Sequence, residues 1–337
     1  MTTWLLAGTF AASLVLTGVV RASAGLLRLV DVPNDRSSHT TPTARGGGLA
    51  IAVVVLLAFG ALAAKGCFDS RTVIGFGGSA AAIAAVGILD DRFSVRASIR
   101  LLIHVAAACW FLIWCWAAVP YPEGGQAPIL LAGWTVLLVI GLVGVVNVVN
   151  FMDGIDGLGA SQAIFMAAAG AWLVGTNGDG ACVQALLGVL AAASAGFLLW
   201  NISPLRIFLG DVGSGFLGFA LAGVFLLASG ESDVPLATWV ILGSPLLADA
   251  GLTLFRRVAR GDRWYEAHRS HAYQNLARHY ASHRLVTLLY LLVSVVWLLP
   301  LAWFSVSFPA YAEVLALIGL VPLIGIAWRL GAGAASA

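Results

Sequence analysis

The sequence predicts an all-α, polytopic membrane protein, and three observations support this fold class. Of 337 residues, 60% are hydrophobic and only 10% are charged, whereas a soluble domain has about 25% charged residues. The mean hydropathy is +0.95, too high for a soluble globule. Apolar runs of about 20 residues, the length that crosses a bilayer as a helix, recur along the chain. We therefore expect a single integral membrane domain over residues 1–337.

About eleven transmembrane helices are expected, because the apolar runs number eleven. They lie near residues 3–20, 46–64, 72–89, 100–119, 129–149, 159–175, 181–200, 212–228, 236–255, 285–304 and 310–328. Several runs are dense in glycine and alanine, which lets helices approach closely in lipid. This composition favours a tightly packed helical bundle.

The basic residues are distributed unequally between the two sides of this bundle. Sixteen of the 18 Lys and Arg residues fall in alternate loops or in the C-terminal tail, and only Lys65 and Arg71 fall on the other side. Basic loops are retained in the cytoplasm, so the N-terminus is predicted outside and the C-terminus inside. The four cysteines show no spacing typical of a disulfide framework or metal site, and Cys67 is expected alone near the outer surface.

Five acidic residues lie at the predicted cytoplasmic ends of separate apolar runs: Asp90, Asp91, Asp153, Asp156 and Asp211. A carboxylate at the centre of a bilayer costs roughly 2.5 to 3.5 kcal/mol, so this clustering at one surface indicates a metal and phosphate site. The catalytic loops are predicted at about residues 21–45, 90–100, 148–158, 201–211 and 256–284.

The first of these loops ends in three glycines, Gly46 to Gly48, that open the next apolar run. Backbone N–H groups at such a helix start can bind an anion. Arg36, His39 and Arg45 would add positive charge. The alternative is a plain connecting loop that carries arginines of the cytoplasmic side.

The second loop places Asp90 and Asp91 side by side, followed by Arg92, Arg96 and Arg100. Adjacent carboxylates repel each other unless a divalent cation or arginines share the site. A surface turn with local ion pairs is the alternative for this loop taken alone.

The third loop carries four polar residues spaced three apart, Asn147, Asn150, Asp153 and Asp156. Residues three apart share roughly one helical face, and Gly154 allows the backbone to bend. The series is therefore predicted to line one cleft.

The fourth and fifth loops complete the set. Asp211 lies in a glycine-flanked turn, where a carboxylate suits a Mg²⁺ ion shared with substrate phosphates; capping the following helix is its structural alternative. In the last loop His268, Arg269 and His271 favour phosphate or sugar contact over zinc, because no third neutral ligand is nearby.

Five motifs in order now resemble a known family, the polyprenyl-phosphate N-acetylhexosamine-1-phosphate transferases of glycosyltransferase family 4. The resemblance covers residues 31–274. Its motifs are Asp31-Val-Pro-Asn-Asp-Arg-Ser-Ser-His39 with Arg45-Gly-Gly-Gly48, Leu89-Asp-Asp-Arg92, Asn150-Phe-Met-Asp-Gly-Ile-Asp-Gly-Leu158, Phe208-Leu-Gly-Asp-Val-Gly-Ser214 and His268-Arg-Ser-His271.

The resemblance implies a role for each matching residue. Asp211, Asp90 and Asp91 would hold or border the metal, and the full catalytic set would be Asp90, Asp91, Asp153, Asp156, Asp211 and His271. Substrate contacts would come from Arg36, His39, Arg45, Arg100, Asn147, Asn150, Asn201, Phe208, His268 and Arg269. The last loop lacks the three-histidine run of the peptidoglycan branch, which argues against a muramyl-pentapeptide substrate.

The implied reaction passes a sugar-1-phosphate from a UDP-N-acetylhexosamine to undecaprenyl phosphate with Mg²⁺, or Mn²⁺ as the alternative cation, and releases UMP. The motif forms resemble the O-antigen-initiating branch of lipopolysaccharide synthesis, with UDP-N-acetylfucosamine, UDP-N-acetylquinovosamine or UDP-N-acetylglucosamine as donor. The implied location is the bacterial inner membrane with the site facing the cytoplasm, and a homodimer is compatible with the family. No nucleic-acid partner is expected.

Two rival functions remain to be weighed. An ion-coupled transporter also places acidic residues within many-span bundles, and Asp249 is the residue that such a protein would use. A buried packing role near the inner membrane surface is the other interpretation of Asp249. A lipid-phosphate phosphatase would need a nucleophilic His or Cys constellation, which the motifs do not supply.

Overall fold

The computed structural model describes residues 2–31, 42–121, 128–202, 204–262 and 268–334. Over these ranges the chain is almost entirely helical, which confirms the all-α prediction. The only strands in these ranges are β1 (Val30–Asp31) and β2 (Thr43–Ala44), two residues each and antiparallel. They close the base of the first catalytic loop.

All eleven predicted spans are helices in the structure. Ten are at least 18 residues long and apolar enough to cross a membrane, and the second, α2, is apolar but has 17 residues. The spans are α1 (Thr2–Leu27), α2 (Gly48–Ala64), α3–η1–α4 (Ser70–Thr72, Val73–Gly77, Gly78–Phe93), α5 (Ala97–Trp114), α6 (Pro128–Phe151), α7 (Leu158–Asn177), α8 (Ala181–Asn201), α9 (Gly210–Glu231), α10 (Leu236–Ala259), α12–η3–α13 (His283–Val293, Ser294–Leu298, Leu299–Ser307) and α14 (Ala312–Arg329).

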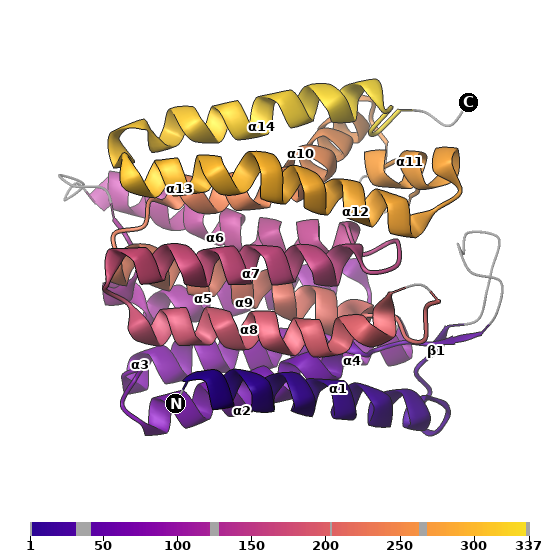
Figure 1. The fold of residues 1–337 in the computed structure, drawn as a ribbon, viewed down its shortest axis with the longest axis horizontal. Helices are drawn as coiled ribbons and strands as arrows, with labels where there is room; N and C mark the ends of the chain where they lie inside the picture. Colours follow the sequence, from indigo (N-terminus) through magenta and orange to yellow (C-terminus); the bar gives the residue numbers. More distant parts are fainter. Residues whose placement is uncertain (1, 32–41, 122–127, 203, 263–267, 335–337) are drawn as a thin grey trace.

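Three short helices connect these spans. Two are 3₁₀ turns, η2 (Trp116–Ala118) and η4 (Pro309–Tyr311). The third is α11 (Ala272–Tyr280), which precedes α12 and lies at the end of the bundle that carries β1 (Figure 1).

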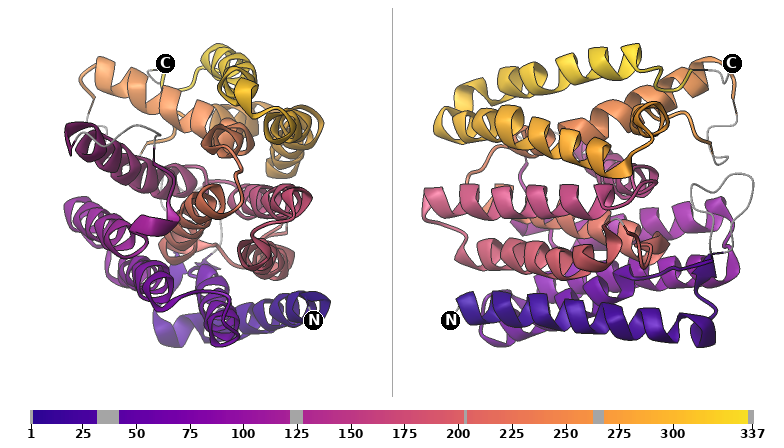
Figure 2. Two further views of the ribbon diagram at one scale, coloured as in Figure 1. Left: turned by 90° about the vertical axis from the view of Figure 1, so that its left-hand side faces the viewer. Right: turned by 45° about the vertical axis from the view of Figure 1, so that its right-hand side comes forward.

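Helix α9 forms the centre of the bundle. It is buried almost throughout its length and packs against α2, α4, α6, α7, α8 and α10. The helices run nearly side by side (Figure 1), and the end-on view in Figure 2 looks along most of them. Because α9 begins with the Asp211 motif, the packing of this one helix determines where the fourth catalytic loop lies.

Close helix contacts at glycines fix the start of α9. A Cβ atom on Gly48 of α2 would lie 2.0 Å from the Cα of Gly213, and one on Gly87 of α4 would lie 2.5 Å from the Cα of Val212. Neither distance is possible for a real side chain, so only glycine lets α2 and α4 approach α9 this closely. The three catalytic loops on these helices are thereby drawn together.

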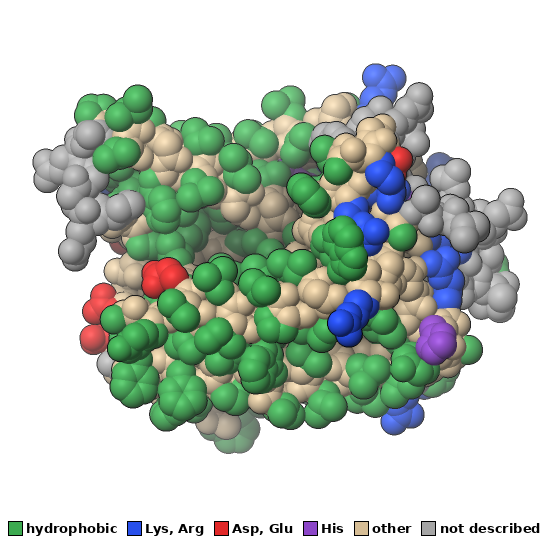
Figure 3. Space-filling view, turned by 90° about the horizontal axis from the view of Figure 1, so that it is seen from above, with side chains coloured by type: hydrophobic (Ala, Val, Ile, Leu, Met, Phe, Trp, Pro, Cys, Tyr) green, Lys and Arg blue, Asp and Glu red, His purple; other side chains and the backbone are tan. Residues whose placement is uncertain are grey.

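The loops that carry the five motifs lie at one end of the bundle, the end of β1 and α11 in Figure 1. Most Lys and Arg side chains visible in Figure 3 gather toward this end. Lys65, after α2, and Arg71, in α3, lie at the opposite end. The charge asymmetry predicted from the sequence is therefore an asymmetry of the folded molecule.

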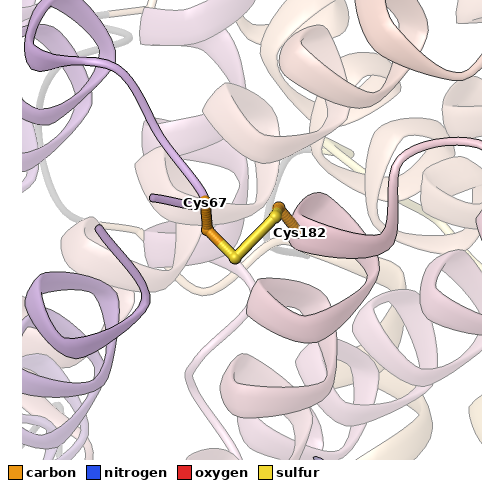
Figure 4. Close-up of a disulfide and its surroundings, with 2 residues drawn as sticks. All are labelled: Cys67 and Cys182. Carbon is orange, nitrogen blue, oxygen red and sulfur yellow. A yellow bond between two sulfur atoms is a disulfide. The ribbon is translucent and has the colours of Figure 1, made fainter. Parts of the chain in front are cut away.

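A disulfide corrects one expectation from the sequence. Cys67, expected to lie alone, is bonded to Cys182 at the start of α8, with Cα atoms 5.3 Å apart (Figure 4). The two residues are 115 positions apart, and such long-range pairing leaves no spacing signal in the sequence. The bond joins the α2–α3 connection to α8 at the end of the bundle opposite the motif loops. Cys109 and Cys115 are free.

Candidate active site

The first turn of α9 holds Asp211, and side chains from three other loops converge on it. Arg45 forms an ion pair with the Asp211 carboxylate, and the Asn150 amide donates to Asp211 Oδ1 at 2.5 Å. Arg100 Nη1 lies 3.7 Å from the same oxygen. Residues from the first, second, third and fourth loops are thus brought within a few ångströms of one carboxylate.

Asp91 holds the start of α9 in place. Its carboxylate accepts hydrogen bonds from the backbone N–H of Asp211 at 2.8 Å and of Val212 at 3.1 Å. Arg45 Nε lies 2.7 Å from Asp91 Oδ1, and the Asp91 side chain is fully buried. The first N–H groups of a helix have no partner within the helix and carry partial positive charge. The capping role considered for Asp211 therefore falls to Asp91.

Asp90 occupies a different environment from its neighbour. It pairs with Arg100 and accepts a hydrogen bond from the backbone N–H of Val95 at 2.7 Å. Its carboxyl group is also in hydrogen-bonding contact with that of Asp211. The repulsion between two carboxyl groups this close is relieved by a shared proton, by a cation, or by Arg100, which lies near both.

Asp153 adds a fourth carboxylate to this cluster. Burial, and then the negative charge of Asp211, raises the pKa of Asp153 well above its ordinary value. Among the residues that the structure describes, no hydrogen bond to this carboxylate is found. The carboxylate oxygens of Asp153 are therefore available to bind a ligand.

The cluster has the composition of a Mg²⁺ site. When ionised, the carboxylates of Asp90, Asp91, Asp153 and Asp211 outnumber the guanidinium groups of Arg45 and Arg100 by two negative charges. Mg²⁺ prefers such oxygen ligands and usually shares its coordination with substrate phosphates. In the described part of the chain no three His, Cys, Asp or Glu side chains are arranged to hold a metal by themselves. A cation held by these residues would need oxygens of the substrate phosphates as further ligands.

Two glycines of the first motif, Gly47 and Gly48, donate their N–H groups to the fourth motif. The N–H groups of Gly47 and Gly48 donate to the carbonyls of Phe208 and Leu209, each at 2.9 Å. The N–H of Phe208 donates back to the Ala44 carbonyl at 2.9 Å. These bonds join the first motif to the fourth and place Arg45 beside Asp211. Two other predicted residues of this loop, Arg36 and His39, lie outside the described residues.

The series from Asn147 to Asp156 divides in the structure, because α6 ends at Phe151. Asn150 points into the site and also donates to Ser214 Oγ at 2.9 Å. The Asn147 amide donates to the Val143 carbonyl of its own helix at 2.7 Å. Asp156 turns toward α12, where its carboxylate lies 3.0 Å from His283 Nδ1.

Asn201 and Phe208 flank the same loops. Asn201 is buried; its Oδ1 accepts from the N–H of Gly157 at 3.1 Å and its Nδ2 donates to the Ile207 carbonyl at 3.0 Å. It thus ties the third loop to the fourth. Phe208 is half-buried.

The fifth motif lies against the end of α6. The rings of His268 and His271 stack with centroids 4.9 Å apart, and each faces Phe151 at 6.5 and 6.2 Å respectively. Burial, with the charges of His271 and Arg257, lowers the pKa of the His268 imidazole to about 4, so this ring is neutral at pH 7. Arg269 is exposed, and its carbonyl accepts a hydrogen bond from Arg278 at 3.2 Å.

Three residues near the site were not selected from the sequence. Ser214 contacts Asn150, and it stands one turn after Asp211. His104 lies one turn after Arg100 on α5, and no partner for its buried Nδ1 is found among the described residues. Spacings of three and four along a helix could have identified both. Tyr273 donates its hydroxyl to the Phe151 carbonyl at 2.9 Å, a contact with no sequence signal.

Comparison with known proteins identifies the family of this chain. The model of glycosyl transferase family 4 matches residues 73–229, which carry the second, third and fourth motifs. A probable undecaprenyl-phosphate N-acetylglucosaminyl 1-phosphate transferase of Bacillus subtilis (strain 168) is 28% identical, over 84% of this chain and 79% of the relative.

Two further relatives extend the comparison. A decaprenyl-phosphate N-acetylglucosaminephosphotransferase of Mycobacterium leprae is 32% identical, over 83% of this chain and 78% of the relative. A phospho-N-acetylmuramoyl-pentapeptide-transferase of Synechococcus sp. (strain CC9605) is 29% identical, over 58% of this chain and 59% of the relative. With similarity along most of its length and the motif residues gathered at one end of a helical bundle, the chain belongs to glycosyl transferase family 4, the polyprenyl-phosphate N-acetylhexosamine-1-phosphate transferases.

Proposed function

We propose that this protein transfers an N-acetylhexosamine-1-phosphate from a UDP-sugar to undecaprenyl phosphate and releases UMP. The observation that carries the proposal is the convergence of Asp90, Asp153, Asp211, Arg45 and Arg100 at one end of the bundle. Such a set of acids and arginines suits two phosphate-bearing substrates. The end of a membrane bundle is also where a soluble donor and a lipid acceptor can meet.

The proposed reaction is a direct displacement. An oxygen of the lipid phosphate attacks the β-phosphorus of the UDP-sugar, a new P–O bond forms, and the bond to the oxygen that leaves with UMP breaks. The acceptor is largely dianionic at neutral pH, because the second pKa of a phosphate monoester is about 6, so little help from a base is needed. Arg45 and Arg100 would neutralise and orient the phosphates through charge-assisted hydrogen bonds.

Asp211, Asp90 and Asp153 would hold the cation, whose chemistry is neutralisation of charge on the phosphates. Asp153 takes the place first expected for Asp91, because both oxygens of Asp91 already bind backbone N–H groups. Mg²⁺ is the proposed ion and Mn²⁺ the alternative.

An alternative pathway uses Asp90 as a base or as a covalent nucleophile. The nucleophilic version predicts a covalent phosphosugar adduct on the protein, with release of UMP, after incubation with donor in the absence of lipid. Intact-mass measurement of the protein after such an incubation distinguishes the two pathways, and an adduct on Asp90 would exclude direct attack.

The donor is proposed to be UDP-N-acetylglucosamine or one of its 6-deoxy relatives, UDP-N-acetylfucosamine and UDP-N-acetylquinovosamine. The names of the Bacillus and Mycobacterium relatives support the first. The forms of the first and last motifs support the other two, and with them the O-antigen-initiating branch. A pocket discriminates weakly against one added hydroxyl, so a donor panel is needed to choose among them.

The test is UMP release by detergent-purified protein with each donor, undecaprenyl phosphate and Mg²⁺. Release should require lipid and Mg²⁺ and should collapse in Asp211→Asn. Asp69→Asn is the matched control, because Asp69 is exposed, caps α3 through the N–H of Thr72 and lies at the opposite end of the bundle. Folded protein that releases no UMP with any donor would overturn the proposal.

The transporter alternative loses its main support in the structure. Asp249, the acidic residue that it would use, is buried but surrounded by hydrogen-bond donors of the protein itself. A carboxylate satisfied in this way needs no transported ion as a partner.

A further inference from the structure

Asp249 of α10 forms hydrogen bonds with two other helices, α11 and α12. The residue is 1% exposed. Its carboxylate accepts hydrogen bonds from the backbone N–H groups of Ala272 at 2.8 Å and Tyr273 at 2.9 Å, both in the first turn of α11. It also accepts one from the Tyr290 hydroxyl of α12 at 3.0 Å. These hydrogen bonds fix the buried Asp249 carboxylate in one position, and the carboxylate in turn fixes the groups that donate to it.

The two backbone bonds make Asp249 the cap of α11. Unpaired N–H groups at a helix start attract a carboxylate, and here the carboxylate comes from another helix. Asp91 makes the same pair of contacts with α9. Helices α9 and α11, which begin at the fourth motif and directly after the fifth, are therefore each fixed by an aspartate from a neighbouring transmembrane helix.

Asp249 also determines how His271 faces the site. His271 Nδ1 lies 3.3 Å from Asp249 Oδ1, and the ring is almost completely buried. With Nδ1 directed to a carboxylate, Nε2 is the nitrogen left for another partner. The stacked ring of His268 and the Phe151 ring border this imidazole.

The same helix start is tied to the acidic cluster. The Tyr273 hydroxyl donates to the Phe151 carbonyl at 2.9 Å, one residue after Asn150 and two before Asp153. A connection therefore runs from Asp249 through the first turn of α11 to the end of α6.

We propose that Asp249 is a positioning residue for the transfer reaction: it holds α11 and the His271 imidazole against the end of α6, so that the last motif meets the donor beside Asp153. The proposal rests on the proposed function and adds to it a residue outside the five motifs. Asp249 touches no substrate in this scheme and acts only through His271 and α11.

The first test compares Asp249→Asn with His271→Ala and the double variant. Asp249→Asn should lower kcat/KM for the UDP-sugar by about 10- to 100-fold, the range expected for leaving buried N–H groups unpaired. In the His271→Ala background the same change should lower kcat/KM much less, because its effect passes through His271. An equal loss of kcat/KM in both backgrounds would overturn the proposal.

Thr253→Val is the matched control. Thr253 Oγ1 lies 3.3 Å from the same Asp249 oxygen but belongs to α10 itself. Removing this donor leaves the link to α11 intact, so kcat/KM should stay near that of the wild type. A loss equal to that of Asp249→Asn would show that the carboxylate matters to α10 alone.

A second readout is independent of activity. Hydrogen–deuterium exchange of the amides in Ala272–Tyr280 should accelerate in Asp249→Asn, while exchange at the start of α9 should not change. Unchanged exchange in α11 would refute the capping role. If the wild type releases no UMP while exchange responds as expected, the proposed function fails and the anchoring of α11 stands.

Tyr273→Phe tests the same connection if Asp249→Asn does not fold. This variant keeps the ring and removes only the hydroxyl bond to Phe151. It should lower kcat/KM and accelerate exchange in α11. Wild-type values for both would overturn the connection between α11 and α6.

Discussion

Asp90 and Asp91 are adjacent in the sequence, but their carboxylates face different partners. Asp91 binds two backbone N–H groups of α9, whereas Asp90 faces Arg100 and the Asp211 carboxyl group. An asparagine at position 90 can still accept from the Val95 N–H. An asparagine at position 91 turns an N–H₂ group toward one of the two donors that it must accept.

We therefore expect Asp91→Asn to lower the free energy of unfolding by about 1 to 3 kcal/mol and Asp90→Asn to leave it nearly unchanged. Activity should fall in both, by about 100-fold or more at Asp90 if it faces the reacting phosphates. Thermal melting in detergent and UMP release, measured side by side, separate the two effects. Equal stability of the two variants would contradict the capping role of Asp91.

His268 predicts a pH dependence of stability. Burial and the charges of His271 and Arg257, opposed by Asp249 and Asp262, lower its pKa from 6.5 to about 4. Between these values the unfolded chain binds a proton that the folded protein does not, so stability is present above pH 6.5 and declines as the pH falls. The melting temperature of His268→Gln should decline less than that of the wild type over this window. Parallel declines would show that the pKa of His268 is the same in the folded and the unfolded protein.

For single residues, the sequence predicted most of the polar side chains that the structure brings together, but not the partners of each. Asp211, Asn150 and Arg45 could be selected from motifs at the ends of apolar runs. Which donor each meets depends on side-chain directions across helices far apart in the chain. Asp156 illustrates this. Its spacing from Asn150 and Asp153 predicted that it would line the same cleft, but its carboxylate faces His283.

At the scale of helices, the approach of α2 to α9 is the most restrictive contact beside the site. Gly48→Ala should destabilise the protein by about 1 to 3 kcal/mol, because its Cβ would lie 2.0 Å from the Gly213 Cα. Activity should fall as well, since Gly48 follows the loop that places Arg45. Gly60→Ala is the control on the same helix: its Cβ would meet nothing within 4 Å, and alanine favours a helix by up to about 1 kcal/mol. Melting temperatures that fall equally in both variants would contradict this packing argument.

Helix positions could be predicted because apolar length alone marks a membrane span. The details within the spans could not be predicted from the sequence. The segments η1 and η3 widen two of the helices into π-helical turns, and no residue pattern in the sequence marks them. The start of α11 was hidden in part: Gln274 accepts a hydrogen bond from the nearby His271 N–H, but the N–H groups of Ala272 and Tyr273 bind Asp249 in another helix.

At the scale of the whole molecule, two independent features bear on its orientation in the membrane. Basic residues gather at the end that holds the motif loops (Figure 3), and such loops face the cytoplasm. The Cys67–Cys182 disulfide lies at the other end, and disulfides persist in oxidising compartments outside the cytoplasm. From charge and redox chemistry we predict the same orientation, with the motif loops inside and the N-terminus outside.

This orientation predicts the behaviour of the cysteines in intact bacterial cells that express the protein. A membrane-impermeant maleimide should label Cys67 and Cys182 only after treatment with a membrane-impermeant reductant, because both thiols are then free and face outward. The variant with both residues changed to serine should take up no label from outside. In that variant an added Arg96→Cys, on the motif side, should react only after the cells are permeabilised. Labelling of Arg96→Cys in intact cells would reverse the orientation. Labelling of Cys67 without reductant would keep the orientation but show that the disulfide does not form there.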